Sequence, residues 1–227
     1  NHPRDHKINL VSPANFIHWR EMNRVFEDIA AVGLTFNTTL TGYGEPVELP
    51  MQFVSAQFFP IVGVQPALGR AFTAEEDRPR SGVVVISDRL WRTRLNADPD
   101  ILNRTITLQG VSQTVIGVMP PGFSFLGKTV VLWLPVGFPA GARTPRGRWL
   151  MTDARLKPGV TFEQAQHDMT RVAGELVVQF RDFNTGWTAR VVPLREQLTG
   201  DVRPALLVLL GAVGFVLLIA CANVANL

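Results

Sequence analysis

A long apolar stretch, Ala205 to Leu227, closes the sequence and contains no Asp, Glu, Lys, Arg or His. As an α-helix, these 23 residues would extend over ~34 Å, which is enough to cross the ~30 Å hydrocarbon core of a bilayer. A helix with one face in water would carry polar residues every three or four positions, and Ala205 to Ala222 carries none. We therefore predict a transmembrane helix over residues 204–227 and an extramembrane part over residues 1–203. The alternative is a helix buried on all sides in a large globular domain.

The two ends of the sequence lead us to expect a piece of a longer protein. The chain starts at Asn1, and its first 30 residues contain no apolar core of a signal peptide. The apolar stretch ends at Leu227 without the Lys or Arg residues that usually follow a membrane helix on its cytoplasmic side. We expect further sequence beyond both ends.

Residues 1–203 have an ordinary globular composition, and their length suits one domain with two lobes or two small domains. The formal net charge of the chain is only +3, and no basic run is interleaved with aromatic residues, so we exclude nucleic acid as a partner. The one cysteine, Cys221, lies in the apolar stretch, so no disulfide bond forms within the chain. This cysteine usage is compatible with either side of a membrane.

The first third of the chain alternates helix and strand patterns. Ser12-Pro13 resembles a helix N-cap followed by proline in the first turn, and apolar residues then recur at helical spacing. We predict an amphipathic helix from Pro13 to about Ala31, ended by Gly33. Turn residues and alternation then predict two strands and a short helix, over residues 34–40, 47–54 and 55–62.

The middle of the chain is rich in strand patterns. Apolar or alternating runs predict strands over residues 83–86, 105–108, 113–118 and 130–134. Ser87 is placed to cap a helix that reaches Leu95. The second and third of these strands are separated by Gln109 to Ser112, which predicts a hairpin.

Three adjacent acidic residues precede these strands: Glu75, Glu76 and Asp77. Adjacent carboxylates cannot all face one ion, and the Gly and Asn spacing of a calcium loop is absent. We therefore predict no metal site here, and interpret the acids as the solvated start of a helical turn capped by Thr73.

The clearest helix signal in the extramembrane part follows a strand predicted over residues 150–156. Thr161 and Gln164 match a capping box, and apolar residues from Phe162 to Phe180 define one helix face. Trp187 to Val192 predicts a further strand. This strand–helix–strand order predicts two parallel strands joined by a right-handed crossover.

Together these patterns predict an α+β fold. Residues 1–63 and 149–200 would form one lobe from paired strand–helix–strand units. Residues 64–148 would form a second, β-rich lobe inserted between them, and residues 204–227 the transmembrane helix.

One stretch fits the P-loop pattern G-x-x-x-x-G-K-[ST] of ATP-binding proteins, through Gly122, Gly127, Lys128 and Thr129. A working P-loop follows a buried parallel strand and opens a helix whose N-terminal amides hold the phosphates. Here Met119-Pro120-Pro121 separates the loop from the preceding strand, and the β-branched run that follows is a poor helix start. No later apolar strand ends in an Asp that could hold Mg²⁺. We interpret the match as chance and expect no cofactor.

No arrangement of catalytic or metal-ligating residues emerges from the sequence. The four histidines are scattered without paired spacing, and we expect exposed surface histidines: His2, His6, His18 and His167. No G-x-S-x-G motif is present. We therefore expect no catalytic residue, no metal site and no enzymatic activity.

Six segments in collinear order resemble one permease family. They are VSPANFIHWREMNRVFEDIAA, VSAQFFPIVGVQPALGRAFTAEED, VVVISDRLWRTRL, ITLQGVSQTVIGVMPPGF, LKPGVTFEQAQHDM and DVRPALLVLLGAVGFVLLIACANVANL. As a set, they resemble the MacB/FtsX-type ABC transporter permeases, and most closely the acidobacterial-type duplicated orphan permeases. The resemblance runs from about Leu10 to Leu227.

The resemblance implies that residues 1–203 form an extracytoplasmic, MacB-like periplasmic core domain with two lobes. The apolar stretch would begin an FtsX-like permease domain in the bacterial inner membrane, in contact with lipid. The implied protein partners are an ABC ATPase subunit, a second permease as a homodimer or paired duplicated half, and a periplasmic or outer-membrane protein. ATP would bind to the ATPase, so the resemblance implies no nucleotide site in this chain.

The resemblance also implies a mechanical, non-catalytic role. ATP-driven dimerisation of the ATPase would move the membrane helices, and the periplasmic domain would transmit that motion for export or envelope mechanotransmission. The segment from Val191 to Pro204 would be the coupling joint, although Pro204 could equally serve only to start the helix. The alternative function is a membrane-anchored extracytoplasmic binding or scaffold module without an ATPase partner.

Overall fold

The computed structural model describes residues 10–127, 129–199, 208–213 and 217 of the 227-residue chain. The chain forms two compact units, Asn1–Arg190 and Val191–Leu227. In the second unit, helix α6 covers Leu194–Thr199, and residues 208–213 and 217 are also helical. The other positions of the transmembrane helix predicted over 204–227 lie outside the described residues. Among the helices of the described part, none combines the length and hydropathy that crossing a membrane requires.

The described strands of the first unit form one nine-stranded sheet, in which strand pairing closes a ring. The path β2-β6-β7-β5-β8-β3 returns to its start because β2 also pairs with β3. The β5–β7 and β3–β8 pairs are parallel, and the other ring pairs are antiparallel. Closure removes the open edges that a flat sheet would expose. The ring strands are β2 (Phe36–Thr41), β3 (Val47–Val54), β5 (Val83–Ile86), β6 (Thr105–Leu108), β7 (Val111–Val118) and β8 (Leu132–Pro135).

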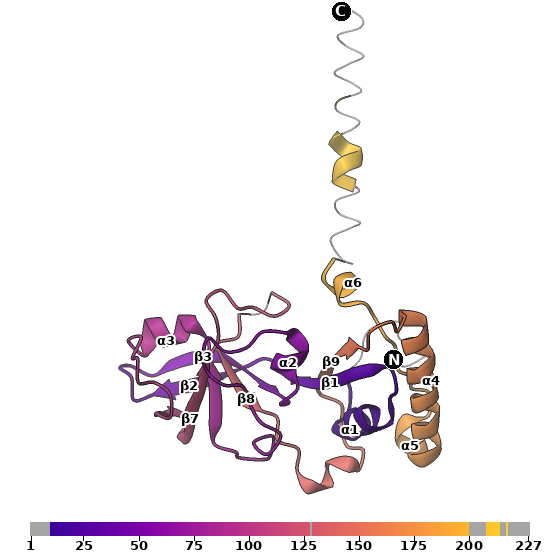
Figure 1. The fold of residues 1–227 in the computed structure, drawn as a ribbon, viewed down its shortest axis with the longest axis horizontal. Helices are drawn as coiled ribbons and strands as arrows, with labels where there is room; N and C mark the ends of the chain where they lie inside the picture. Colours follow the sequence, from indigo (N-terminus) through magenta and orange to yellow (C-terminus); the bar gives the residue numbers. More distant parts are fainter. Residues whose placement is uncertain (1–9, 128, 200–207, 214–216, 218–227) are drawn as a thin grey trace, which may run out of the picture. The chain divides into compact units, whose positions relative to one another are not determined.

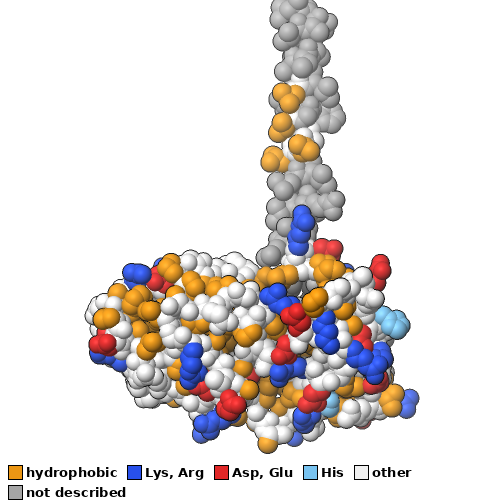
Figure 2. All heavy atoms as spheres, viewed as in Figure 1, with side chains coloured by type: hydrophobic (Ala, Val, Ile, Leu, Met, Phe, Trp, Pro, Cys, Tyr) orange, Lys and Arg blue, Asp and Glu red, His pale blue; other side chains and the backbone are white. Residues whose placement is uncertain are grey.

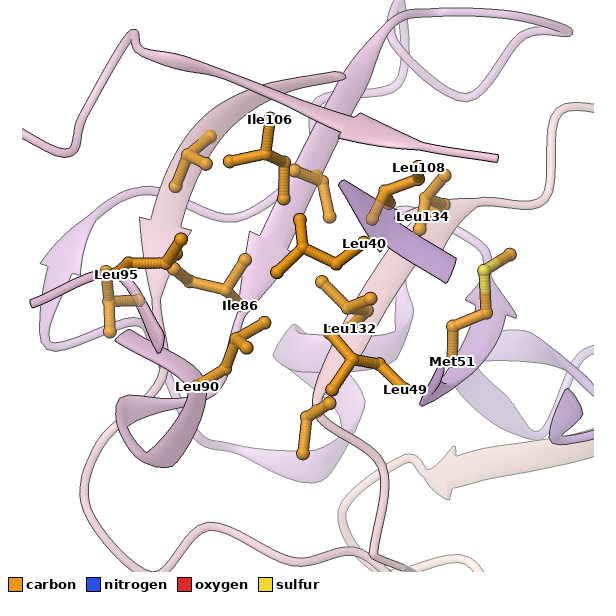
Figure 3. Packing of buried hydrophobic residues seen from close by; sticks show 14 of the residues in the cluster. Leu40, Leu49, Met51, Ile86, Leu90, Leu95, Ile106, Leu108, Leu132 and Leu134 are labelled. Atoms are coloured by element: carbon orange, nitrogen blue, oxygen red, sulfur yellow. The ribbon is translucent and has the colours of Figure 1, made fainter. Parts of the chain in front are cut away.

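A hydrophobic core fills the interior of the ring (Figure 3). Strands β3, β5, β6 and β8 each contribute two side chains at alternate positions, as the period of two in a β-strand requires. Strand β2 contributes one, and β7 contributes two that lie three positions apart, where its register with β5 shifts. Helix α3 (Asp88–Arg94) and the loop after it add Leu90 and Leu95. The strand residues of this core are Leu40, Leu49, Met51, Val84, Ile86, Ile106, Leu108, Val115, Val118, Leu132 and Leu134.

A second core covers the outside of the ring, where Trp133 alternates with the inward-facing Leu132 and Leu134. The Trp133 and Phe59 ring centroids lie 6.1 Å apart in an edge-to-face arrangement, which suits aromatic pairs. This core joins the ring to β1 (Phe26–Gly33). It combines outward ring residues, two residues of helix α2 (Phe58–Val62) and two of β1: Val85, Ile116, Trp133, Phe58, Phe59, Ala30 and Val32.

Outside the ring, β1 runs antiparallel to β9 (Leu150–Leu156), and their last pair is Gly33↔Leu150. β1 is joined to the ring through one pair, Val32↔Val54 of β3. All ring strands therefore lie between Gly33 and Leu150 in the sequence. The lobe boundary predicted between residues 63 and 64 falls inside the ring, because β2 and β3 precede it and pair with β6 and β8.

Three helices accompany β1 and β9: α1 (Pro13–Met22), α4 (Phe162–Gln179) and α5 (Arg181–Asn184) (Figure 1). Helix α1 begins where the Ser12 hydroxyl accepts a hydrogen bond from the Asn15 amide at 3.1 Å. Helix α4 begins with the predicted capping box of Thr161 and Gln164, which is confirmed. The remaining short elements are β4 (Leu68–Gly69), which pairs with β7, and a 3₁₀ helix, Ala140–Arg143.

Several other predicted elements are confirmed. The strands over 47–54 and 83–86 are β3 and β5, the helix over 55–62 is α2, and Ser87 caps α3. Strands β6 and β7 form the predicted hairpin. Its turn residues, Gln109 (φ 47°) and Gly110 (φ 77°), both lie in the left-handed region that a two-residue type I′ turn requires.

The helix predicted from Pro13 to about Ala31 is wrong beyond Met22. Asn23 ends it: its side-chain amide donates to the carbonyls of Trp19 and Arg20, both at 2.9 Å, and its Oδ1 accepts from the Phe26 amide. Residues 26–33 then form β1, which is buried between its neighbours. Pairing with β9 therefore outweighed the helical spacing of the apolar residues.

The strand predicted over Trp187 to Val192 is also wrong, because these residues, all described, form no strand. The Ala189 carbonyl accepts a hydrogen bond from the Gln166 side chain of α4 at 2.9 Å, where a strand would use a sheet neighbour. At Leu150, β9 already has a neighbour on each side: β1 on one side and an isolated bridge to Val11 on the other. The predicted parallel strand–helix–strand unit is therefore not formed by this segment.

Candidate functional site

The candidate site lies at the end of the first unit, where the chain leaves it. The exit segment, defined as residues 185–190, follows α5 and precedes the second unit. These six described residues form neither helix nor strand, so side chains from other elements must fix their position. The Arg148 and Gln166 side chains contact the exit segment, and the Trp187 amide donates to the Asn184 carbonyl at 2.9 Å.

Arg148 makes the most extensive of these contacts. Its guanidinium carbon lies 4.4 Å from the Phe183 ring centroid and 3.9 Å from that of Trp187, within the range of cation–π attraction. Its Nη2 donates to the Phe183 carbonyl at 3.1 Å and to Asn184 Oδ1 at 3.2 Å. Burial lowers the pKa of this guanidinium. We call Arg148, Phe183, Asn184 and Trp187 the clasp, because they tie α5 and the exit segment to the start of β9.

The clasp is connected to α1 through a pair of buried amides. Asn184 and Asn15 are 2 % and 5 % exposed. Asn15 Nδ2 donates to Asn184 Oδ1 at 2.9 Å, and Asn184 Nδ2 donates to Asn15 Oδ1 and to the Leu176 carbonyl, both at 3.3 Å. Buried polar groups that are all hydrogen-bonded fix one arrangement of their helices. Helices α1, α4 and α5 are thus held in register with the exit segment.

A second polar contact braces α4 against the turn between α1 and β1. The Asp168 carboxylate accepts from the Arg24 amide at 2.8 Å and from Arg171 Nη2 at 2.8 Å, and Arg171 also donates to the Met22 carbonyl. Burial opposes ionisation of Asp168, but these donors together hold its pKa below the ordinary value of 3.8. The helix that supports the exit segment is therefore anchored at both its N-terminal and C-terminal halves.

Two of the three adjacent acidic residues, Glu76 and Asp77, form an ion pair or hydrogen bonds within the protein. Asp77 accepts from the Ala56 amide at 3.1 Å and the Gly137 amide at 3.0 Å, and Glu76 pairs with Arg70 at 2.6 Å. Residues 74–76 form a turn and no helix, so the predicted helix start is wrong. Within the described residues, no group of three or more His, Cys, Asp or Glu residues could hold a metal ion.

Asp77 also lines an open cleft of about 560 Å³ beside α1 and β1. The charges there largely pair: Arg20 with Asp28 at 2.6 Å and Glu21 with Arg143 at 2.5 Å. Hydrogen bonds from Arg143 lower the pKa of Glu21. Figure 2 likewise shows acidic and basic side chains interspersed on the visible face. A surface without one dominant sign is unlike a nucleic-acid interface.

The P-loop letters do not build a P-loop in the described residues. Gly122 and Gly127 (φ 75° and 68°) lie in turns, and the next element is strand β8 instead of a helix. Phe123 and Phe125 pack on the outer core. Lys128 lies outside the described residues and Thr129 is exposed, so the interpretation as a chance match stays a prediction.

Of the two histidines that the structure describes, one is exposed as predicted and the other is not. His167 is exposed on α4. The exposure predicted for His18 is wrong: it is half-buried, its ring centroid lies 5.4 Å from that of Phe180, and its Nε2 is buried without a partner. The apolar face of α1 is wider than its spacing suggested, because α4 and α5 cover it. His2 and His6 lie outside the described residues.

Comparison with known proteins gives one consistent result. The model of the family described as MacB-like periplasmic core domain matches residues 8–172. The macrolide export ATP-binding/permease protein MacB of Shigella dysenteriae is 30% identical over 122 residues, 52% of this chain and 19% of that protein. Its counterpart in Burkholderia pseudomallei is 27% identical over 121 residues, 52% of this chain and 18% of that protein. The match thus spans about a fifth of these relatives.

Solved structures show the same fold. The periplasmic region of MacB from Actinobacillus actinomycetemcomitans aligns with a TM-score of 0.58 and 16% identity, over 76% of this chain and 77% of that one. The extracellular domain of the noncanonic ABC-type transporter YknZ from Gram-positive bacteria aligns with a TM-score of 0.54 and 14% identity, over 75% and 84%. At these identities, the likeness concerns the fold alone.

Proposed function

The chain belongs to the family of the MacB-like periplasmic core domain, and from this premise we propose that it transmits ATP-driven motion in an ABC permease. In this proposal the chain itself is non-catalytic. An ABC ATPase subunit supplies the energy, and motion reaches the first unit through residues 191–204. The output is export of a substrate or mechanical action on a partner in the cell envelope.

The observation that carries the proposal is the clasp. A segment that transmits motion must not slip against the domain that it moves, and residues 185–190 have no regular secondary structure to hold them. The clasp, the Asn15–Asn184 pair and the Gln166–Ala189 hydrogen bond attach this segment to α1, α4, α5 and β9. Such attachment lets displacement of residue 190 move the unit as one body.

We further propose where this chain lies and what it contacts. Residues 204–227 would be a transmembrane helix in lipid, the start of an FtsX-like permease domain, and residues 1–203 would be periplasmic in a bacterium with the permease in its inner membrane. The partners would be the ATPase, a second permease copy or duplicated half, and a periplasmic or outer-membrane protein. We propose that the inserted lobe covers residues 34–149, between Gly33 of β1 and Leu150 of β9, rather than residues 64–148.

A spectroscopic experiment tests the proposal. The complete permease is reconstituted with its ATPase in proteoliposomes, with Cys221 replaced by serine. A spin label is attached at Val178→Cys, a position on α4 that is 85% exposed. Distances between the labels of two permease copies are then measured with and without a non-hydrolysable ATP analogue. The Arg148→Met variant keeps an apolar stem and removes the clasp, while Arg146→Met changes an exposed arginine of the same loop as a control.

We expect the analogue to change the distance in the unsubstituted protein and in Arg146→Met. In Arg148→Met the distance distribution should broaden and respond less, while ATP hydrolysis by the ATPase continues. An unchanged response in Arg148→Met would refute the role of the clasp. No response in any version would refute motion transmission and support the alternative, an anchored binding or scaffold module.

A further inference from the structure

A small cavity lies beside the clasp, between α1, α4 and the exit segment. Its volume is about 30 Å³, and its polar lining consists of Asn15, Trp19, Arg148, Asn184, Trp187 and Thr188. A cavity of this size, above the ~10–15 Å³ that one water needs, holds a water or a small ion and excludes larger ligands. The charges and hydrogen-bonding groups of the lining residues therefore determine which small species binds there.

The charge in the cavity lining is positive and unbalanced. Arg148 is its only ionised residue, since the remaining lining residues are apolar: Leu10, Val11, Ala173, Leu176 and Ala189. In the described ranges of the chain, no carboxylate forms an ion pair with Arg148. The Phe183 and Trp187 rings and two hydrogen-bond acceptors replace part of the water that burial removes, but none of them carries a full negative charge. Burial lowers the pKa of Arg148 accordingly.

The lining also holds unused hydrogen-bond donors. Trp19 Nε1 is buried and has no partner. An indole nitrogen can only donate, so it requires an acceptor. Within the described residues, both hydrogen bonds of Arg148 come from Nη2, so Nε and Nη1 of the guanidinium remain as donors. The amides of Asn15 and Asn184, by contrast, satisfy each other.

We propose that this cavity binds a small monovalent anion, such as chloride, between the Trp19 indole N–H and the Arg148 guanidinium. A water would accept the Trp19 hydrogen bond but would bring no negative charge to the arginine. An anion accepts that hydrogen bond and also supplies the charge, and the cavity is too small for phosphate esters or peptides. The inference concerns the occupant of one cavity and holds whether or not the chain transmits motion.

The test compares anions at constant ionic strength. The complete chain in a neutral detergent is unfolded thermally in sodium chloride and in sodium gluconate, whose anion is too large for the cavity. Chloride should raise the unfolding midpoint over gluconate, since at ten times its dissociation constant a ligand raises the folded-to-unfolded ratio about elevenfold. Trp19→Phe removes the donor and keeps a ring, and should lose most of this effect. Trp91→Phe, which removes an indole donor on α3, should keep it.

Bromide provides a second readout that does not depend on stability. Bound next to Trp19 and Trp187, it should quench part of the tryptophan fluorescence saturably, and Trp19→Phe should abolish the saturable part. Two results would overturn the inference. Superimposed chloride and gluconate curves, with purely linear bromide quenching, would mean that the cavity holds water. A chloride effect that survives in Trp19→Phe would place the anion elsewhere.

Discussion

The buried pair of Asn15 and Asn184 allows the sharpest prediction about stability. The Asn184 side chain takes part in four hydrogen bonds, two with Asn15, one to the Leu176 carbonyl and one from Arg148. At about 0.5–1.5 kcal/mol for each, with a further penalty for each buried group left unpaired, Asn184→Ala should cost about 2–4 kcal/mol. Asn15→Ala breaks only the two shared bonds and should cost about 1–3 kcal/mol.

The double variant discriminates between this network and simple loss of packing. Once one partner is gone, removing the other no longer breaks the shared bonds or leaves the first unpaired. The double variant should therefore be more stable than the sum of the single costs predicts, by about 1–2 kcal/mol. Urea unfolding, followed by tryptophan fluorescence, gives the four free energies of unfolding. Strictly additive costs would refute the view that these amides act as one unit.

Three further predictions concern the elements around the site. Gly69→Ala should cost more than 3 kcal/mol, because its Cβ would lie 2.2 Å from the Ile116 carbonyl oxygen at φ +72°, whereas Gly42→Ala, at φ +89° in open space, should cost only about 1 kcal/mol. Thr161→Ala removes the α4 capping box and should cost about 1 kcal/mol by urea unfolding. The depressed pKa of Asp168 means that its contribution is complete above about pH 4, its unfolded value, and is lost as the pH falls through the folded value. A pH series of unfolding free energies should therefore fall less steeply at acid pH in Asp168→Asn.

Each of these predictions has a result that would contradict it. Equal costs for the two glycine substitutions would show that the close approach at Gly69 relaxes freely. A neutral Thr161→Ala would mean that tertiary packing alone holds the first turn of α4. Parallel acid profiles for the unsubstituted chain and Asp168→Asn would show that Asp168 has the same pKa in the folded and unfolded states.

The parts of the fold that could be predicted from sequence are those set by neighbouring residues. The caps at Ser12, Ser87 and Thr161 lie within three residues of their partners, and the turn at Gln109-Gly110 needs only its own backbone angles. These signals are complete in a short window of sequence. They led to correct helix starts and a correct hairpin.

The predictions were wrong where residues distant in the sequence determine the local structure. Phe26 and Ile29 continue the helical spacing of α1, and only pairing with β9, more than 120 residues later, makes them a strand. Ring closure requires β2 to pair with both β3 and β6, and no local sequence pattern predicts these pairings. The clasp could not be predicted from the sequence for the same reason. Arg148 lies just before the strand predicted over residues 150–156, and its aromatic partners lie 35 or more positions away.

The pairing of Gly33 with Leu150 makes the ring a replaceable module. The chain leaves β1 and re-enters β9 at directly opposite positions, so everything between them occupies the place of a hairpin loop. The entropy of closing such a loop grows only slowly with its length, so its size matters little to the strands that flank it. A different domain could meet the same two strand ends, provided that it also covers Ala30 and Val32 of β1, which the outer core of the ring now buries. Evolution can therefore change what the protein presents at a distance from the clasp without disturbing the register of β1 and β9.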